Sequence, residues 1–389
     1  MSLRILIAPS GFKESLSAEE VANSIEAGIT KVLPSAHILK APLVDGGEGF
    51  TKALVDATGG TLHELTVIGP AGVPVRSHFG FLGGQQKKTA VVEMAAAAGL
   101  RLVPADSRNP LLTTTYGVGE LIRAALDAGA ERILVGCGDS GTNDGGAGMA
   151  QALGIRLLDQ NGRDLGWGGG ELSRLMRIDM TFRDPRLDRV QIDVACNWHN
   201  VLCGPKGVAR VFGPQKGASQ EIVEQLEQAL NRYADIIEHD LGQDVRTSPG
   251  SGASGGLGAG LQAFLGATLH PRYEIVMQYL ELDNLLKQVD LVITAEGAID
   301  YQTPFGKIPA EVARRAKQYQ LPVIALVGTI GQDAEINFSY GIDFFASILE
   351  APCLLTEAIA KASTLLTHAA ERTIRLLLVG KQLLPSLTG

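Results

Sequence analysis

Residues 3–9 read LRILIAP, a short apolar run that a polar loop, SGFKESL, follows. An uninterrupted apolar run of this length is typical of a strand that is buried on both faces of a parallel sheet. Ser17 and Glu20 then form a capping-box pattern, which predicts a helix that ends near Pro34. A strand near HILKAPL, the loop DGGEG and a helix that ends at Gly59 follow. This β-α-β-α order indicates an α/β fold.

The same alternation returns near the other end of the chain. From about residue 285, strand-like and helix-like runs alternate again: DLVITAEG, EVARRAKQY, PVIALVG, IDFFASI and a last helix ending near LLLVG. The runs TLHELTVIG, PVRSHFGFLG and KKTAVVEMA are instead extended and split by Gly and Pro, which favours antiparallel strands. We therefore predict a discontinuous α/β domain at 1–62 and 285–389 and an inserted mixed α/β domain at 63–284.

The composition narrows the class of protein. The chain has 389 residues, 45% of them hydrophobic, and a formal net charge of −8. This balance is ordinary for a globular enzyme and argues against a nucleic acid or an anionic membrane as partner. No run approaches the roughly 18 apolar residues of a membrane helix. The four cysteines lack zinc-site spacing and read as free thiols, so we expect a cytoplasmic location. The oligomeric state stays open.

Residues 136–148 read GCGDSGTNDGGAG and follow a strand-like run, ERILV. The first six residues match the dinucleotide fingerprint GxGxxG, which requires a helix at the glycines and a second parallel strand. The further glycines at 145–148 disfavour a helix there. The next run, IRLLDQNGRDL, reads as a hairpin that turns at Asn161 and Gly162. The context therefore favours an anion-binding loop over an NAD site, with a plain flexible loop as the alternative.

Three other loops are rich in glycine: DGGEG at 45–49, FGPQKG at 212–217 and GSGASGGLGAG at 250–260. None of them is a Walker A sequence. Glycine lets a backbone approach an anion closely, and carboxylates beside a phosphate point to a divalent cation between them. We therefore predict a polyphosphate and metal site built from several loops. Its predicted phosphate-binding residues are Gly138, Ser140, Asn143, Gly145, Gly146, Lys216, Gly255 and Gly256.

Several charged residues follow predicted strands, where ligands of α/β sheets bind. Lys13 is a cation suited to a carboxylate or a phosphate, although a solvated loop lysine is the commoner case. Asp45 and Glu48 could hold Mg²⁺ or position a hydroxyl, or merely cap a helix. Glu296 and Asp300 follow the strand DLVIT and could bind a metal or act as a base, with helix capping by Asp300 as the alternative.

Asp193 lies within the strand-like run QIDVAC. A buried and unpaired acid is costly, so we expect Asp193 either to face the surface or to serve the reaction. His199, in CNWHN, reads as a packing or surface residue rather than a base.

Long blocks of the chain resemble the bacterial class I glycerate kinases. They are IAPSGFKESLSAEEVA, PLVDGGEGF, VVEMAAAAGL, NPLLTTTYGVGELI, GCGDSGTNDGGAGMAQALG, VFGPQKGA, SGGLGAGLQAFLGA and LVITAEGAIDYQT. The resemblance spans nearly the whole chain. It implies a flavodoxin-like domain interrupted by a second domain, with the site in the cleft between them. It also implies transfer of the γ-phosphoryl group of ATP to D-glycerate, which yields 2-phosphoglycerate.

Phosphoryl transfer depends mainly on positioning and charge stabilisation, so we hypothesise the following roles for the candidate residues. The 136–148 and 250–260 loops would offer amides to the ATP phosphates. Lys13 would bind the glycerate carboxylate or the migrating phosphoryl group, and Glu48 would contact the substrate. Asp45, with Glu296 or Asp300, would hold Mg²⁺. Either Asp193 or Asp45 would orient the attacking hydroxyl. The expected partners are therefore the small molecules ATP and D-glycerate.

Five positions depart from the family pattern. The first block usually reads Asp-Ser where this chain has Ser10-Gly11. Asn197 stands where the family has an aspartate, Ala298 where it has an arginine, and Ala98 where a serine is common. These departures remove carboxylates and a cation that could serve metal or substrate. The alternatives are a 3-phosphoglycerate-forming kinase, a kinase for a related hydroxy acid, a nucleotide-dependent dehydrogenase and a metabolite-binding sensor.

Overall fold

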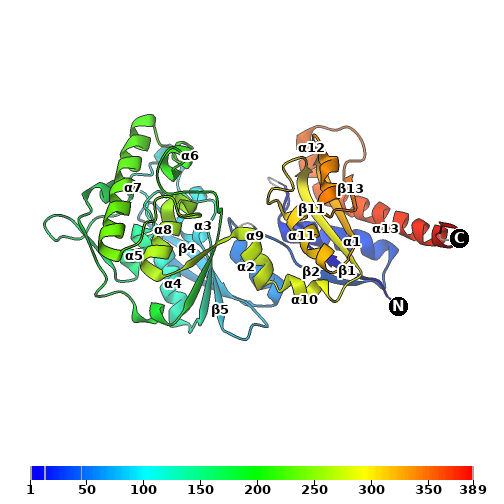
Figure 1. The fold of residues 1–389 in the computed structure, drawn as a ribbon, viewed down its shortest axis with the longest axis horizontal. Helices are drawn as coiled ribbons and strands as arrows, with labels where there is room; N and C mark the ends of the chain where they lie inside the picture. The colour runs from blue at the N-terminus through cyan, green and yellow to red at the C-terminus, as the bar shows by residue number, and fades with distance from the viewer. Residues whose placement is uncertain (1, 13–14, 45, 388–389) are drawn as a thin grey trace. The chain divides into compact units, whose positions relative to one another are not determined.

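The computed structural model describes residues 2–12, 15–44 and 46–387, and the chain divides into two compact units (Figure 1). Unit 1 comprises residues 1–44 and 276–389, and unit 2 comprises residues 45–275. The first boundary therefore lies earlier than the predicted 62/63, and the second earlier than 284/285. The reason is that helix α2 (Phe50–Thr58) packs against strands β3, β4 and β5 of unit 2.

Unit 1 contains a five-stranded parallel sheet. Its order is β13 (Phe344–Ser347), β12 (Val323–Ile330), β11 (Leu291–Ile299), β1 (Arg4–Ile7) and β2 (His37–Lys40). In chain order this is the flavodoxin-like arrangement 2-1-3-4-5, which confirms the predicted fold class. The point where the strand order reverses lies between β1 and β11.

The helices of unit 1 include two long ones that bury the same face of β1. Ile5 and Ile7 of β1 share a core with Ile25 of α1 and Leu366 of α13. The predicted capping box at the start of α1 is present. The helix bounds are α1 Ala18–Val32, α10 Leu282–Leu286, α11 Ile308–Gln318, η6 Ala334–Tyr340, α12 Leu355–Ala360 and α13 Ala362–Leu387. Helix α9 (Arg272–Tyr279) spans the boundary of the two units after residue 275.

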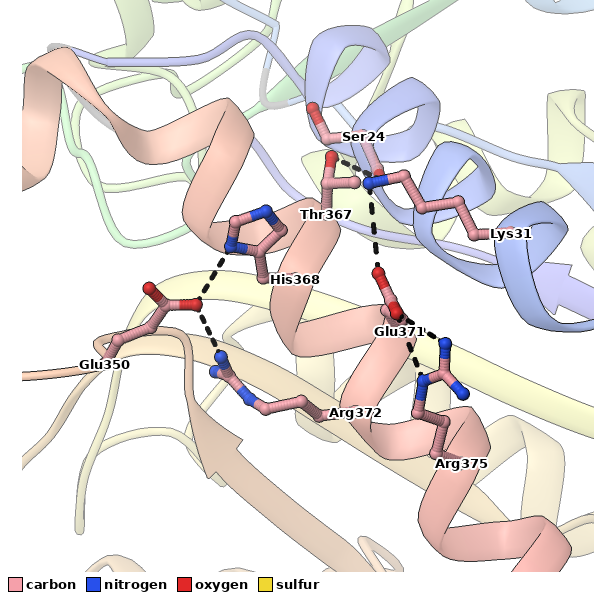
Figure 2. A network of polar contacts seen from close by, with 8 residues as sticks. All are labelled: Ser24, Lys31, Glu350, Thr367, His368, Glu371, Arg372 and Arg375. Atoms are coloured by element: carbon pink, nitrogen blue, oxygen red, sulfur yellow. Dashed lines mark hydrogen bonds and ion pairs between the residues drawn. The ribbon is translucent and has the colours of Figure 1, made fainter.

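Helices α1 and α13 approach each other closely (Figure 2). A Cβ atom on Gly28 would lie 2.2 Å from the carbonyl oxygen of Thr367, so only glycine fits there. Beside it, Thr367 Oγ1 donates to the carbonyl of Ser24 at 3.0 Å, and Lys31 pairs with Glu371 at 3.8 Å. Two segments more than 300 residues apart are thereby joined into one unit.

Unit 2 contains a six-stranded mixed sheet. Its order is β10 (Thr268–Pro271), β9 (Gln191–Cys196), β6 (Arg132–Gly136), β5 (Thr89–Glu93), β4 (Pro74–Phe81) and β3 (Thr61–Ile68). The first four strands are parallel, and β4 pairs antiparallel with both β5 and β3. The antiparallel strands predicted from the sequence are therefore confirmed. A separate pair, β7 (Arg156–Leu158) and β8 (Arg177–Asp179), is antiparallel.

The helices of unit 2 cover this sheet and its loops. Besides α2, they are α3 Met94–Ala98, η1 Leu100–Leu102, η2 Ala105–Ser107, α4 Tyr116–Asp127, α5 Ala147–Ala152, η3 Gly169–Arg174, η4 Pro185–Asp188, α6 Val208–Phe212, η5 Pro214–Lys216, α7 Gln220–Leu241 and α8 Ala253–Leu265. Within the described part of the chain, no helix has the length and apolarity needed to cross a membrane.

The cysteines are unevenly distributed. Cys137, Cys196 and Cys203 are buried in unit 2, whereas Cys353 is exposed in unit 1. All four are free thiols, as the sequence predicts.

Candidate active site

Three loops of unit 2 meet at the carboxyl ends of β5 and β6. A Cβ atom on Gly138 would lie 2.6 Å from the Cα atom of Gly47, so these two loops touch backbone to backbone. The carboxylate of Asp139 accepts a hydrogen bond from the amide of Glu48 at 2.9 Å. The carbonyl of Asp139 accepts from the amide of Leu100 at 2.8 Å. Asp139 therefore ties loop 46–49 and the segment after α3 to the loop after β6.

The solvent-accessible surface of this edge, which we call the rim, is formed by Glu48, Arg101, Gly138 and Asp139 and carries an ion pair. Arg101 Nη1 lies 2.8 Å from Glu48 Oε1, and both side chains are about half exposed. Asp139 is exposed beside them, and Gly138 is partly exposed. Glu48 was a predicted substrate contact, whereas Arg101 was missed. Its only sequence signal is a lone cation directly after the alanine-rich block.

Below the rim, Lys216 is completely enclosed. Its ammonium donates to Ser140 Oγ at 2.8 Å, Thr142 O at 2.7 Å and Asn143 Oδ1 at 2.9 Å. Burial lowers the pKa of Lys216 to about 7, and the charge of Asp144 partly opposes this. Three predicted phosphate-binding residues are thus brought together, but their polar atoms bond to one another. Direct contact of Lys216, Ser140 and Asn143 with phosphate stays a prediction.

Asp144 fixes the start of α5 from inside the protein. Its Oδ2 accepts from the amide and the hydroxyl of Thr115, each at 2.8 Å. Asp144 Oδ1 accepts from the amide of Gly146, and Oδ2 also accepts from the amide of Gly148, each at 3.2 Å. Burial raises the pKa of Asp144, and these four hydrogen bonds oppose the rise. A buried carboxylate with four donors holds the backbone of this loop in one conformation.

The 250–260 loop packs directly against the 136–148 loop. Ser254, Gly255 and Gly256 have φ values of 52°, 72° and 89°, a left-handed turn inside α8. A Cβ atom on Gly255 would lie 1.8 Å from the carbonyl oxygen of Thr142. The carbonyl of Gly255 accepts from the amide of Gly145 at 3.0 Å. The two predicted phosphate loops therefore form one backbone-to-backbone unit.

The dinucleotide interpretation of GxGxxG does not fit this geometry. Helix α5 begins only at Ala147, after the last positive-φ glycine at 146, and not at the fingerprint glycines. The following strand, β7, pairs antiparallel with β8. A Rossmann site needs a helix and a parallel strand at these positions, so the sequence argument against NAD agrees with the structure.

Asp193 is buried in β9, and its carboxylate is occupied. Oδ2 accepts from Arg132 Nη2 at 2.7 Å and from Gln191 Nε2 at 3.0 Å. Oδ1 lies 2.9 Å from His270 Nε2. Of the two alternatives expected for Asp193, the surface-facing one is wrong, because the side chain is buried and three polar side chains compensate its burial. Its catalytic role stays a prediction.

The carboxyl edge of the unit 1 sheet carries a second polar group. Ser10 follows β1, and its amide and hydroxyl donate to the carbonyl of Ala295 at 2.8 and 3.2 Å. Glu296 lies on β11, and Asp300 follows it. These residues flank the β1/β11 reversal point, where ligands of doubly wound sheets bind. Asp300 Oδ1 accepts from Lys307 Nζ at 2.9 Å, and despite burial, this bond helps to lower the pKa of Asp300.

The predicted metal ligands are only partly described. Asp45 lies outside the described residues, as does Lys13. Across the described ranges, no group of three or more His, Cys, Asp or Glu side chains is arranged to hold a metal. Mg²⁺ commonly takes only one or two protein carboxylates and fills its shell with phosphate oxygens and water. Glu296 and Asp300 fit such a donor set in chemical type, although Asp300 already pairs with Lys307.

A flavodoxin-like unit and a mixed α/β unit with interlocked glycine loops define a two-unit α/β protein. Residues 5–378 match the model of the glycerate kinase family. The chain belongs to this family, and the resemblance seen in the sequence is confirmed.

Curated relatives and a solved structure agree with this assignment. The chain is 50% identical to the glycerate kinase of Bacillus subtilis strain 168, over 95% of this chain and 96% of that protein. It is 46% identical to the glycerate 2-kinase of Escherichia coli K12, over 97% and 99% of the two chains. A crystal structure described as glycerate kinase 2 from Salmonella typhimurium LT2 superposes with a TM-score of 0.88 at 47% identity, covering 98% of this chain and all of that one.

Proposed function

We propose that this chain is an ATP-dependent glycerate kinase that transfers the γ-phosphoryl group of ATP to D-glycerate and releases 2-phosphoglycerate. The observation that carries this proposal is the 46% identity, over 97% of the chain, to a protein named glycerate 2-kinase. Membership of a kinase family implies ATP as the phosphoryl donor. Four free cysteines fit the expected cytoplasmic setting.

The loops of unit 2 hold the phosphates of ATP in this proposal. Phosphoryl transfer depends mainly on positioning and on stabilising charge. The partly exposed backbone at Gly138 and Asp139 offers amides at the rim, and Arg101 beside it offers a cation. Lys216 and Asn143 are enclosed, so their part is to hold the loop in shape. Lys13 remains the proposed ligand of the glycerate carboxylate or of the migrating phosphoryl group.

Mg²⁺ is the proposed counter-ion of the phosphates, with Asp45 and either Glu296 or Asp300 as its protein ligands. When bound, it would neutralise charge that develops on the transferred group. Asp45 is the better candidate for orienting the attacking hydroxyl, because both carboxylate oxygens of Asp193 are already bonded to Arg132 and His270. A carboxylate so engaged is poorly placed to accept a substrate proton.

A coupled assay of the purified protein with ATP, Mg²⁺ and D-glycerate tests the reaction. The product is detected through enolase, with and without phosphoglycerate mutase. Signal without the mutase identifies 2-phosphoglycerate. Signal only with the mutase identifies 3-phosphoglycerate and overturns the proposed product.

A related hydroxy acid as substrate is the second candidate. It is favoured by Ser10, Asn197 and Ala298, which replace charged residues of the family pattern at strand ends. ADP release measured over a panel of 2-hydroxy acids distinguishes the two: a higher kcat/KM for another acid than for D-glycerate would displace glycerate as the main substrate.

A further inference from the structure

Helix α2 begins without a cap of its own. Its N-cap residue, Gly49, has a φ of 84° and no side chain to bond the first-turn amides. Glu93, the last residue of β5, supplies the missing acceptors from another element. Its Oε1 accepts from the amide of Gly49 at 3.1 Å, and its Oε2 accepts from the amide of Thr51 at 3.1 Å. One carboxylate therefore bonds two amides that a helix start would otherwise leave unpaired.

This carboxylate is enclosed. Glu93 has no exposed surface, and His78 of β4 places Nε2 4.0 Å from Glu93 Oε2. Burial raises the pKa of Glu93, and the hydrogen bonds from Thr51 and Gly49 oppose the rise. Burial lowers the pKa of His78, which favours the neutral imidazole at neutral pH. The two amides are thus the principal groups that compensate the ionised form of Glu93.

Other charges around Glu93 act in both directions. Arg101 favours its ionised form and Glu48 disfavours it, while Lys52 of α2 acts on His78. Glu48 lies in the loop whose end Glu93 bonds. The amide of Glu48 is bonded to Asp139. Loop 46–49 is therefore fixed at one end by Glu93 and in its middle by Asp139.

We propose that the ionised carboxylate of Glu93 is a positioning residue for the kinase site. It fixes the start of α2, and through α2 it fixes loop 46–49 against the rim at Gly138 and Asp139. The proposal rests on the proposed function, because that loop carries the predicted substrate contact Glu48. A protonated carboxyl is a weaker substitute for the carboxylate, because its hydroxyl oxygen accepts a hydrogen bond less strongly and its O–H must be directed away from both amides.

The pH dependence of such a group has an unusual sign. Because the folded state raises the pKa of Glu93, its contribution to stability is fully present below the unfolded pKa and declines as pH rises through the folded pKa. The protonated form of Glu93 is the one that stability favours, whereas the position of loop 46–49 depends on the ionised form. As pH falls, activity should therefore decrease while the contribution of Glu93 to stability increases. If Glu93 had only a structural role, the activity of the enzyme would fall with pH only where the stability of the protein falls too.

The test compares E93Q with a matched control, D240N. Asp240 also accepts a backbone hydrogen bond from another element, from the amide of Ile178 at 2.7 Å, and also neighbours a histidine. Both substitutions exchange a carboxylate for an isosteric amide. The kcat/KM of E93Q should fall at least about tenfold at alkaline pH, because a hydrogen bond to a charged group is lost. The deficit should shrink toward acid pH, whereas the pH profile of D240N should run parallel to that of the wild type.

Amide hydrogen exchange supplies a readout that needs no turnover. E93Q should deprotect the amides of Gly49 and Thr51 and leave Ile178 protected, and D240N should do the reverse. If glycerate is not phosphorylated, the exchange result still decides the positioning claim separately from the proposed function. Unchanged protection at Gly49 and Thr51, or wild-type kcat/KM at every pH, would overturn the proposal.

The wild type alone provides a second route if E93Q does not fold. After correction for intrinsic exchange rates, protection of the Gly49 and Thr51 amides should fall as the solution becomes acidic enough to protonate Glu93. Protection that is independent of pH there would overturn the proposal without any variant.

Discussion

The carboxyl edges of the two sheets are built differently. In unit 1, polar side chains come directly from strand ends, and a Cβ atom on Gly297 of β11 would meet nothing within 4 Å. In unit 2, a Cβ atom on Gly255 would lie 1.8 Å from a carbonyl oxygen of the facing loop. The unit 2 edge is thus a frame of loops packed backbone to backbone, which we call the closed frame. The unit 1 edge has open backbone at Gly297 but close packing at Gly328, where a Cβ atom would lie 2.5 Å from the carbonyl oxygen of Gly297.

This difference predicts how substitutions act. Buried polar groups hold the frame of unit 2, with Lys216, Asp144 and Glu93 each bonding several atoms of a loop. Changes in unit 2 should therefore act on stability and loop position. Changes at the unit 1 edge should act on chemistry and leave the fold intact.

The largest expected effect comes from a methyl group at the loop contact. Gly255→Ala should lower the free energy of unfolding by about 4 kcal/mol, because it adds backbone overlap to a left-handed conformation. Gly297→Ala, the matched change in unit 1, should stay within about 0.5 kcal/mol of the wild type. Urea denaturation measures both. Equal stabilities for the two variants would contradict the closed-frame description.

Next in size is the removal of the buried cation. Lys216→Met leaves three oxygens of residues 140–143 without their donor, so we expect a loss of about 3 kcal/mol in unfolding free energy. Lys206→Met removes an exposed lysine and serves as the control. If Lys216→Met keeps wild-type stability and loses only ATP affinity in a binding titration, Lys216 contacts phosphate directly.

At the unit 1 edge, Glu296→Gln should leave the midpoint of thermal unfolding unchanged. Turnover should fall by about 100-fold, and the Mg²⁺ concentration for half-maximal rate should rise, since a charged ligand is lost at the reacting group. Glu335→Gln, an exposed residue of η6, is the control. A variant with the Mg²⁺ dependence of the wild type would remove Glu296 from the metal site.

The smallest effect is expected at the opposite edge of the unit 1 sheet. Arg4 Nη2 lies 2.6 Å from Asp290 Oδ1, and the hydrogen bonds from Arg4 lower the pKa of Asp290 to about 2. The stability from this depressed pKa is present above the unfolded pKa and is lost as pH falls through about 2. Asp290→Asn should abolish that dependence while changing the midpoint at neutral pH only slightly, less at high salt. A large change in the midpoint of thermal unfolding at neutral pH would show that the Arg4–Asp290 pair stabilises the fold more than an exposed ion pair normally does.

The sequence predicted what local signals specify. Ser17 and Glu20 mark the start of α1, and apolar runs bounded by turn residues mark the strands of both units. The boundary after residue 44 was not predictable from local signals, because it depends on the packing of α2 against β3, β4 and β5, which follow it in the chain. The pairing of Asp193 with Arg132 and His270 joins segments 61 and 77 residues away, which no local pattern encodes. Glu93 left only a faint signal, a single acid in the apolar run TAVVEMAAAA.

The uneven distribution of the cysteines makes thiol chemistry a reporter on one unit. Burial raises the pKa of Cys196 and of Cys203 to about 12, and also raises that of Cys137, so all three remain protonated and sheltered in native unit 2. The thiolate is the form that alkylating reagents attack, so Cys353 alone should react quickly. Once Cys353 is blocked, a buried thiol can be alkylated only after unit 2 has opened, so each further alkylation reports an opening of that unit. Pulsed labelling followed by mass measurement would then time the unfolding of the loop-bearing unit separately from that of its neighbour.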